Sequence, residues 1–257
     1  MRLLSIRPAI ARQLPLCLAA ALIALAPLQP ALAQTAPAPA PTYAGGEGKY
    51  LHYLNPTQFD PSLLLPAPYE KDSAAANFEL ETLHRLIASA SKDRMAQALT
   101  DAEVEDPSLF NATVSMDLKN LPATWALLTL VQDEAYLATG YSKAFFKRMR
   151  PYSADPTIPL CEAKADPAKP VFKSYPSGHA TVGYAVGYAL ARLIPAKADK
   201  ILARARDYAM SRQYCGAHYP SDTEAAHTLA TLAAAQLMAD PRLASQIAAA
   251  RAELAKQ

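Results

Sequence analysis

The sequence predicts an all-α protein, a single-domain helical bundle over residues 73–257. Apolar residues recur at helical spacing along most of this range, and no long run alternates polar and apolar residues as a strand does. The chain of 257 residues has only eight glycines and is rich in alanine, the strongest helix former. Its length suits one large domain or two small ones, and no internal repeat is visible.

Residues 1–33 are expected to be a cleaved signal peptide. Three arginines precede an apolar stretch over 14–26 that is too short to span a bilayer, and the small residues of "ALA" at 31–33 form a cleavage site. Cys17 lies inside the apolar stretch rather than behind it, so no lipid anchor is expected. These features predict an exported, periplasmic protein.

Removal of the signal peptide takes away three arginines and no acidic residue, so the formal net charge falls from +2 to −1. This near-neutral charge argues against nucleic acid or an anionic membrane surface as a partner. No later stretch reaches the roughly 18 unbroken apolar residues of a membrane helix, so no membrane insertion is expected.

The rest of the chain divides into an extended, proline-rich N-terminal segment over 34–72 and the helical domain. Ser73 and Pro122 are suited to begin helices, and Pro195 ends one. Together with the apolar spacing, these residues predict helices over 73–90, 122–148, 177–193, 196–214, 221–240 and 241–257.

Some residues of these helices are expected to pack in the interior. Phe78 belongs to the apolar face of the first helix, and Trp125 and Tyr184 are expected in the core. Gly183 and Gly187, one turn apart, would let a neighbouring helix approach closely, since each glycine otherwise costs about 1 kcal/mol against alanine.

The first cluster of polar residues lies in "KAFFKRMRP", where Lys143 and Arg150 stand seven positions apart, just before Pro151. Seven residues are two helical turns, so both cations are expected on one helical face, with extended geometry at Arg150. Lys147 and Arg148 lie off this face and are expected in solvent. The alternative is that the whole cluster is a solvated, basic helix end.

The second cluster is "SYPSGHAT". Ser177 can cap a helix, and Gly178 lets its amide approach a ligand without a Cβ in the way. Free amides at a helix start form an anion site, and His179 beside them could give a proton to a group that leaves the anion. The alternative is a capped helix with an incidental histidine.

The third cluster is "SRQYCGAHYPSD". The guanidinium of Arg212 suits two oxygens of a phosphate. His218 and Asp222 are four residues apart, so the carboxylate can hold one ring nitrogen and leave the other free as a nucleophile. A structural histidine–aspartate pair is the alternative for this cluster alone. Together, the three clusters contain the parts that phosphoryl transfer requires.

No metal or other cofactor is expected. His227 and Glu224 could be drawn into a metal site with His218 and Asp222, but they fall on other sides of a helix.

Cys161 and Cys215 remain after the signal peptide is removed. In an oxidising compartment they are expected to form a disulfide, and the alternative is a pair of buried free thiols.

The clusters follow a known order of motifs. They read K-x6-R-P at 143–151, P-S-G-H at 176–179 and S-R-x5-H-x3-D at 211–222. The chain therefore resembles the type 2 phosphatidic acid phosphatase (PAP2) and vanadium haloperoxidase superfamily, and most of all the secreted class A non-specific acid phosphatases of bacteria. "YLNPTQFDPSLLLPAP", "DEAYLATGYSKAFFKRMRPY" and "CGAHYPSD" extend the likeness over nearly the whole mature chain.

The resemblance implies a secreted, metal-independent acid phosphatase that hydrolyses small phosphate monoesters with broad specificity through a phosphohistidine. His218 would attack phosphorus, oriented by Asp222, while His179 would protonate the leaving alkoxide and then activate water. The residues implied to hold phosphate oxygens are Lys143, Arg150, Ser177, Gly178 and Arg212. An acid optimum follows if His179 must be protonated while His218 is neutral. The resemblance also leaves a homo-oligomer open.

Three departures from the class A pattern concern substrate preference. Lys173 and Ala180 flank the P-S-G-H motif where glycine and threonine are usual, and Tyr219 stands where tryptophan is usual. The alternative functions are a vanadium haloperoxidase, a lipid phosphatase and a phosphate-binding protein without turnover. Haloperoxidase chains tend to be longer, lipid phosphatases usually carry membrane helices, and a mere binder has no use for the His218–Asp222 pair.

Overall fold

The computed structural model describes residues 50–161 and 169–257, and every regular element in these ranges is helical. The all-α fold class is therefore confirmed. The predicted signal peptide and residues 34–49 lie outside the described residues. The longer helices are α2 (Ala74–Ala88), α3 (Lys92–Glu103), α5 (Pro122–Phe146), α7 (Gly178–Leu193), α8 (Ala198–Tyr214), α9 (Pro220–Leu237) and α10 (Ala244–Leu254). The short ones are α1 (Pro61–Leu64), α4 (Asn111–Val114) and α6 (Pro151–Ala154).

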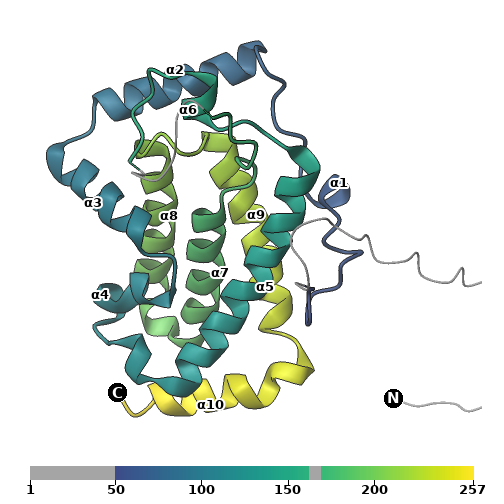
Figure 1. The fold of residues 1–257 in the computed structure, drawn as a ribbon. Coiled ribbons are helices and arrows are strands. Elements are labelled where there is room, and N and C mark those ends of the chain that lie inside the picture. Colours follow the sequence, from purple (N-terminus) through teal and green to yellow (C-terminus); the bar gives the residue numbers. More distant parts are fainter. Residues whose placement is uncertain (1–49, 162–168) are drawn as a thin grey trace, which may run out of the picture. The chain divides into compact units, whose positions relative to one another are not determined.

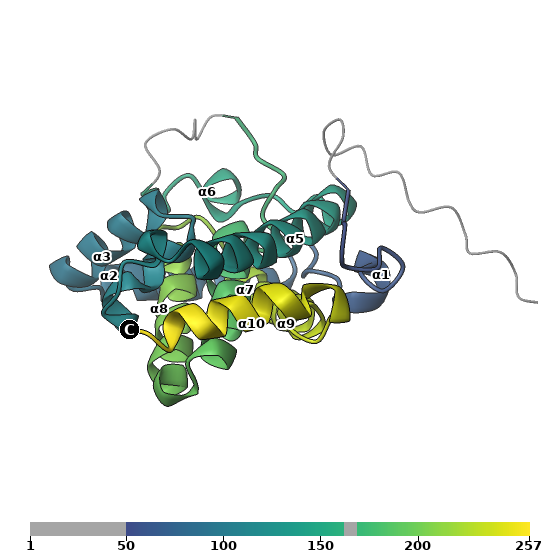
Figure 2. The same cartoon turned by 90° about the horizontal axis from the view of Figure 1, so that it is seen from below.

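Helix α7 lies at the centre, packed against α5, α8 and α9 (Figure 1). Most of its residues are buried, as its small and apolar sequence requires. Helices α5 and α8 end where α7 and α9 begin, so four helix termini meet at one end of the bundle, the upper end in Figure 1. At the opposite end α10 crosses α5 and α7 (Figure 2), and Glu253 of α10 accepts the Thr124 amide at the start of α5 at 2.7 Å.

The close approach predicted at Gly183 and Gly187 occurs between α7 and α8. A Cβ on Gly183 would lie 2.6 Å from Cδ1 of Tyr208, and one on Gly187 would lie 3.0 Å from Cβ of Ala205. Both distances are shorter than ordinary van der Waals contact, so any larger residue would force the two helices apart. The two glycines thus fix how deeply the central helix is buried.

Helices α2 and α3 differ from expectation. Phe78 was placed on the apolar face of α2, but its side chain is 61 % exposed and Glu79 faces the interior instead. Helix α3 was not expected, because its sequence is largely polar. It begins at a Ser91 cap. Its buried Asp101 accepts hydrogen bonds from Arg204 of α8, and its buried Ala98 packs with Cys215 at the end of α8.

Residues 50–60 run along the bundle and are held by Glu134 of α5. Its buried carboxylate accepts the amide hydrogens of His52 at 2.8 Å and of Tyr53 and Leu54 at 3.1 Å. This carboxylate therefore accepts three backbone hydrogen bonds, which attach the segment to α5. Across the described ranges, no helix combines the length and apolar character that crossing a bilayer requires.

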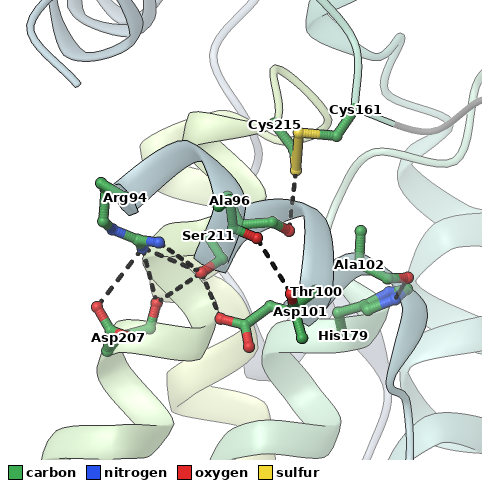
Figure 3. Close-up of a disulfide and its surroundings, with 11 residues drawn as sticks. Arg94, Ala96, Thr100, Asp101, Ala102, Cys161, His179, Asp207, Ser211 and Cys215 are labelled. Carbon is green, nitrogen blue, oxygen red and sulfur yellow. Dashed lines mark hydrogen bonds and ion pairs between the residues drawn. A yellow bond between two sulfur atoms is a disulfide. The ribbon is translucent and has the colours of Figure 1, made fainter. Parts of the chain in front are cut away.

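The structure joins Cys161 and Cys215 in a disulfide, with their Cα atoms 4.7 Å apart (Figure 3). The alternative of two free thiols is therefore not what is found. Cys215 lies at the end of α8, and its carbonyl also accepts the Cys161 amide at 3.2 Å. The bridge fastens the chain after α6 to the turn between α8 and α9.

Candidate active site

The predicted site residues meet where α5 and α8 end and α7 and α9 begin. A pocket of about 490 Å³ opens at this end of the bundle. Its walls include Lys143 of α5, Arg150 just before α6, Gly178 and His179 at the start of α7, and His218 just before α9. Side chains from four separate parts of the sequence therefore face one cavity.

His218 is held by the turn between α8 and α9. The amides of Ala217 and His218 both donate to the Arg212 carbonyl, at 3.1 and 3.3 Å, so the turn closes directly on the end of α8. The His218 side chain is 1 % exposed, and its Nδ1 lies 3.3 Å from Oδ2 of Asp222. A carboxylate only accepts hydrogen bonds, so Nδ1 carries the hydrogen and Nε2 keeps its lone pair for the pocket.

Asp222 is itself fixed by several donors. Oδ2 accepts the Ser174 hydroxyl at 2.5 Å and the Tyr219 amide at 2.9 Å, in addition to His218. Oδ1 accepts Nη1 of Arg148 at 2.6 Å. With this many donors the carboxylate cannot rotate, which is what an orienting partner of a histidine needs.

The prediction that Arg148 is solvated was wrong. Its side chain is buried between Asp222 and Glu79, and Nη2 donates to Oε2 of Glu79 at 2.6 Å. Its guanidinium also stacks on the Tyr219 ring at 3.9 Å. Lys147, in contrast, is exposed as expected. Arg148 and Glu79 are therefore parts of the site that the sequence motifs did not reveal.

The prediction that Lys143 and Arg150 share a helical face was also wrong. Helix α5 ends at Phe146, and Lys147 adopts a left-handed conformation with φ of 48°. The chain then leaves the helix, which turns Arg148 inward and brings Arg150 to the pocket from an extended backbone. Both cations line the pocket nevertheless. The seven-residue spacing of Lys143 and Arg150 therefore spans the end of α5 and a turn, rather than two turns of one helix.

The cationic side chains of the site are largely withdrawn from water. Burial, followed by the nearby Arg150, lowers the pKa of Lys143 to about 7. Burial and Arg150 likewise lower the pKa of Arg212 to about 10, and burial lowers that of Arg150. Nε of Arg150 is buried and has no hydrogen-bond partner within the described ranges. Because these buried cations are poorly solvated, an anion bound in the pocket would stabilise their charged forms.

The start of α7 adds backbone donors. Ser177 is the cap, and its hydroxyl accepts the Ala180 amide at 3.4 Å. The amides of Gly178 and His179 have no intrahelical acceptor at this position, and both residues line the pocket. A Cβ on Gly178 would lie 3.1 Å from the Tyr136 ring, so glycine also fits a crowded wall. This geometry matches the anion site predicted for the helix start.

His179 is held by a segment whose role the sequence did not suggest. Its Nδ1 lies 3.2 Å from Oε1 of Glu105. Its Nε2 lies 3.3 Å from the Ala102 carbonyl oxygen, a contact shown in Figure 3. Burial lowers the pKa of His179, while the charge of Glu105 raises it. The pKa of His179 remains below its ordinary value, and Glu105 offsets part of the shift that burial causes.

His218 differs from His179 in its charge environment. Burial lowers its pKa well below the ordinary value, and Arg150, Lys143 and Arg212 lower it further. A neutral His218 beside a His179 that Glu105 helps to protonate is the division of protonation states that a nucleophile and an acid require.

In the described part of the chain, no group of three or more His, Cys, Asp or Glu side chains is arranged so that it could hold a metal ion. His227 stacks on Tyr184 with ring centroids 4.3 Å apart, and its Nδ1 lies 3.8 Å from the exposed Glu224. His227 therefore lies outside the pocket.

Comparison with known proteins agrees with this geometry. The family model described as "PAP2 superfamily" matches residues 122–244, a range that contains the motif residues of the site. A non-specific acid phosphatase of Providencia stuartii is 32 % identical over 213 residues, which cover 80 % of this chain and 86 % of the relative. An acid phosphatase of Zymomonas mobilis is 32 % identical over 202 residues, 77 % of this chain and 76 % of the relative. A non-specific acid phosphatase of Salmonella typhimurium is 29 % identical over 196 residues, 74 % and 78 % respectively.

Proposed function

The chain belongs to the non-specific acid phosphatases of the PAP2 superfamily, and from that premise we propose that it hydrolyses phosphate monoesters through a phosphohistidine on His218. The observation that carries the proposal is the His218–Asp222 pair at a pocket that Lys143 and Arg150 also line. This pair supplies an oriented nucleophile, and the cations supply the charge that a phosphoryl group needs.

In the first step, Nε2 of His218 attacks phosphorus as the bond to the leaving oxygen breaks. The leaving oxygen takes the electron pair of that bond and a proton from His179. Lys143, Arg150, Arg212 and the α7 amides hold the three equatorial oxygens, whose charge changes little while the central bonds are exchanged. Asp222 stabilises the imidazolium that forms on His218.

In the second step, the now neutral His179 takes a proton from water, and the oxygen of that water attacks phosphorus. The N–P bond breaks, its electron pair returns to Nε2 of His218, and inorganic phosphate leaves. His179 is protonated again at the end of the cycle, so it acts first as acid and then as base. Each of these roles accelerates its step by roughly 10²–10⁴-fold.

We propose that neither a metal nor another cofactor takes part, because protein cations occupy the positions from which Mg²⁺ neutralises phosphate elsewhere. Broad specificity is proposed from the relatives of Providencia stuartii and Salmonella typhimurium, which are named non-specific acid phosphatases. Export to the periplasm rests on the features of residues 1–33, and a homo-oligomer stays an untested expectation from the family.

Hydrolysis of p-nitrophenyl phosphate with EDTA present, compared between the wild type and His218→Ala, tests the proposal. The wild type should be active and most active in acid, and the variant should lose at least a thousandfold, on the order of a missing nucleophile. His227→Ala is the matched control, because this histidine lies outside the pocket. An inactive wild type that binds phosphate, or one that oxidises halide when vanadate is added, would favour the alternative functions.

A further inference from the structure

Both ring nitrogens of His179 face acceptors on one short segment, residues 102–105. The carboxylate of Glu105 lies 3.2 Å from Nδ1, and the Ala102 carbonyl lies 3.3 Å from Nε2. Only an imidazolium can donate from both nitrogens at once, so this surrounding selects the protonated ring. The contact to Ala102 is long, and a leaving oxygen in the pocket could take its place.

The segment that carries Glu105 is fastened on both sides. Before it, Asp101 accepts the Ser211 hydroxyl at 2.5 Å (Figure 3). Asp101 also accepts a hydrogen bond from Arg204. Next to it, the Val104 carbonyl accepts the Tyr208 hydroxyl. After it, Asp106 accepts the Ser108 amide at 2.8 Å. Glu105 is therefore presented to His179 by a rigid support rather than by a free loop.

We propose that Glu105 is a positioning residue for His179: its carboxylate holds Nδ1–H, so that Nε2 is the atom that passes the proton to the leaving oxygen. This rests on the proposed function of His179 as the acid. The site then contains two carboxylate–histidine pairs, Asp222–His218 for attack on phosphorus and Glu105–His179 for departure of the alcohol.

The charges around His179 make this role necessary. Three ionisable groups face the pocket: Lys143 of α5, Arg150 before α6 and His218 before α9. Tyr208 of α8 stacks against the His179 ring, with the ring centroids 6.1 Å apart. Glu105 is the acidic group in contact with the His179 ring. Positive neighbours and burial disfavour the imidazolium, and Glu105 opposes both. Without Glu105, His179 would lose its proton at lower pH, and the limb on which activity falls as pH rises would move toward acid.

The role also predicts a dependence on the leaving group. An alkoxide needs the proton of His179 to depart, whereas p-nitrophenolate is stable as an anion and needs it little. A carboxylate that merely stabilised the fold would affect both substrates equally. One that positions the acid selectively slows release of the alkyl alcohol in the first step, whereas the second step, in which His179 acts as base, is common to both substrates.

Glu105→Gln, which keeps the shape and removes the charge, tests the inference with glycerol phosphate and p-nitrophenyl phosphate. In single-turnover measurements of the first step, we expect the rate of glycerol release to fall roughly tenfold, part of what an acid contributes, with little change in the rate of p-nitrophenolate release. The alkaline limb should move by about half to one pH unit toward acid. Glu105→Asp should restore part of both effects. Glu81→Gln is the control, because Glu81 is an exposed carboxylate of α2 that does not line the pocket.

The same assays with His179→Ala separate the two proposals. If His179→Ala keeps full activity on glycerol phosphate, the proposed acid is wrong. If His179→Ala loses that activity while Glu105→Gln keeps the wild-type limb and substrate ratio, only the role of Glu105 is wrong. A Glu105→Gln variant whose KM falls while kcat and the pH limb stay unchanged would show instead that Glu105 competes with the phosphate for the cations.

Discussion

At the scale of single residues, the candidate site buries its ionisable groups and gives its two histidines different charge environments. His218 is biased toward its neutral form by burial and three cations, while Glu105 opposes the same pressure on His179. An anion in the pocket adds compensating charge to these buried cations. Two consequences can be measured on single side chains.

The first consequence concerns Lys143, whose pKa of about 7 makes anion binding depend on pH. A bound anion favours the ammonium form, so above this pH binding must take up a proton. The affinity for an anion should be constant below the pKa of Lys143. Above it, the affinity should weaken with rising pH, toward a limit of about tenfold per pH unit. Calorimetric titration with sulfate, whose own charge is constant in this range, measures the effect.

Lys143→Arg should remove this pH dependence, because a guanidinium stays protonated. Lys147→Arg is the matched control, since Lys147 is exposed at the end of the same helix. An unchanged slope in Lys143→Arg would show that another group takes up the proton.

The second consequence concerns Arg148. Arg148→Met would leave Asp222 and Glu79 buried without their shared cation, which typically costs about 3–5 kcal/mol of unfolding free energy. Urea denaturation measures the loss, and kcat should fall because Asp222 loses one of its fixing donors. Arg148→Lys, which keeps a charge, should retain more of both, and Lys147→Met should change neither. Wild-type stability and kcat in Arg148→Met would show that this network is dispensable.

At the scale of elements, caps and spacing predicted most helices, and the failures have physical causes. Ser73 and Ser177 cap α2 and α7 as expected from their sequence. Helix α3 was missed because polar residues make up most of it, and its contact with α8 depends in part on the buried Asp101. The end of α5 was misplaced because the left-handed turn at Lys147 has no glycine or asparagine to signal it.

The turn between α8 and α9 gives a prediction at this scale. Gly216 has φ of +64°, and a Cβ there would lie 2.3 Å from the Pro159 carbonyl oxygen. Gly216→Ala should therefore cost more than the roughly 1 kcal/mol of an unfavourable backbone alone, and it should displace His218 and lower kcat.

Gly140→Ala is the control for this prediction. Gly140 lies within α5 and has no atom within 4 Å of a Cβ position. The substitution should stabilise the protein by up to about 1 kcal/mol. Thermal unfolding of both variants makes the comparison, and equal effects on Tm would contradict it.

At the scale of the whole molecule, the fold brings together residues that the sequence keeps far apart. The motif residues could be predicted because each type has a known chemical use. Glu79, Glu105 and the buried role of Arg148 could not, since their partners lie 69 or more residues away in the chain. Glu79, a charge on the inner face of a helix, is the one weak signal in the sequence.

The disulfide gives a prediction for the molecule as a whole. It closes a loop of 54 residues, which stabilises the fold by roughly 4 kcal/mol in the chain-entropy model. Reduction should lower Tm and should lower activity less than stability, because α8 and α9 still hold the turn. The Cys161→Ser/Cys215→Ser double variant should have a Tm that reductant does not change. A wild type whose Tm ignores reductant would mean that the bridge contributes nothing.

The central claim is that phosphate passes through Nε2 of His218, and rapid quenching of the His179→Ala variant during p-nitrophenyl phosphate turnover tests it most directly. This variant lacks the base for the second step, while p-nitrophenolate can still leave in the first. One equivalent of p-nitrophenolate should appear in a burst, with acid-labile phosphate on the peptide that contains His218. Turnover without a burst or label, or a label on another residue, would contradict the mechanism.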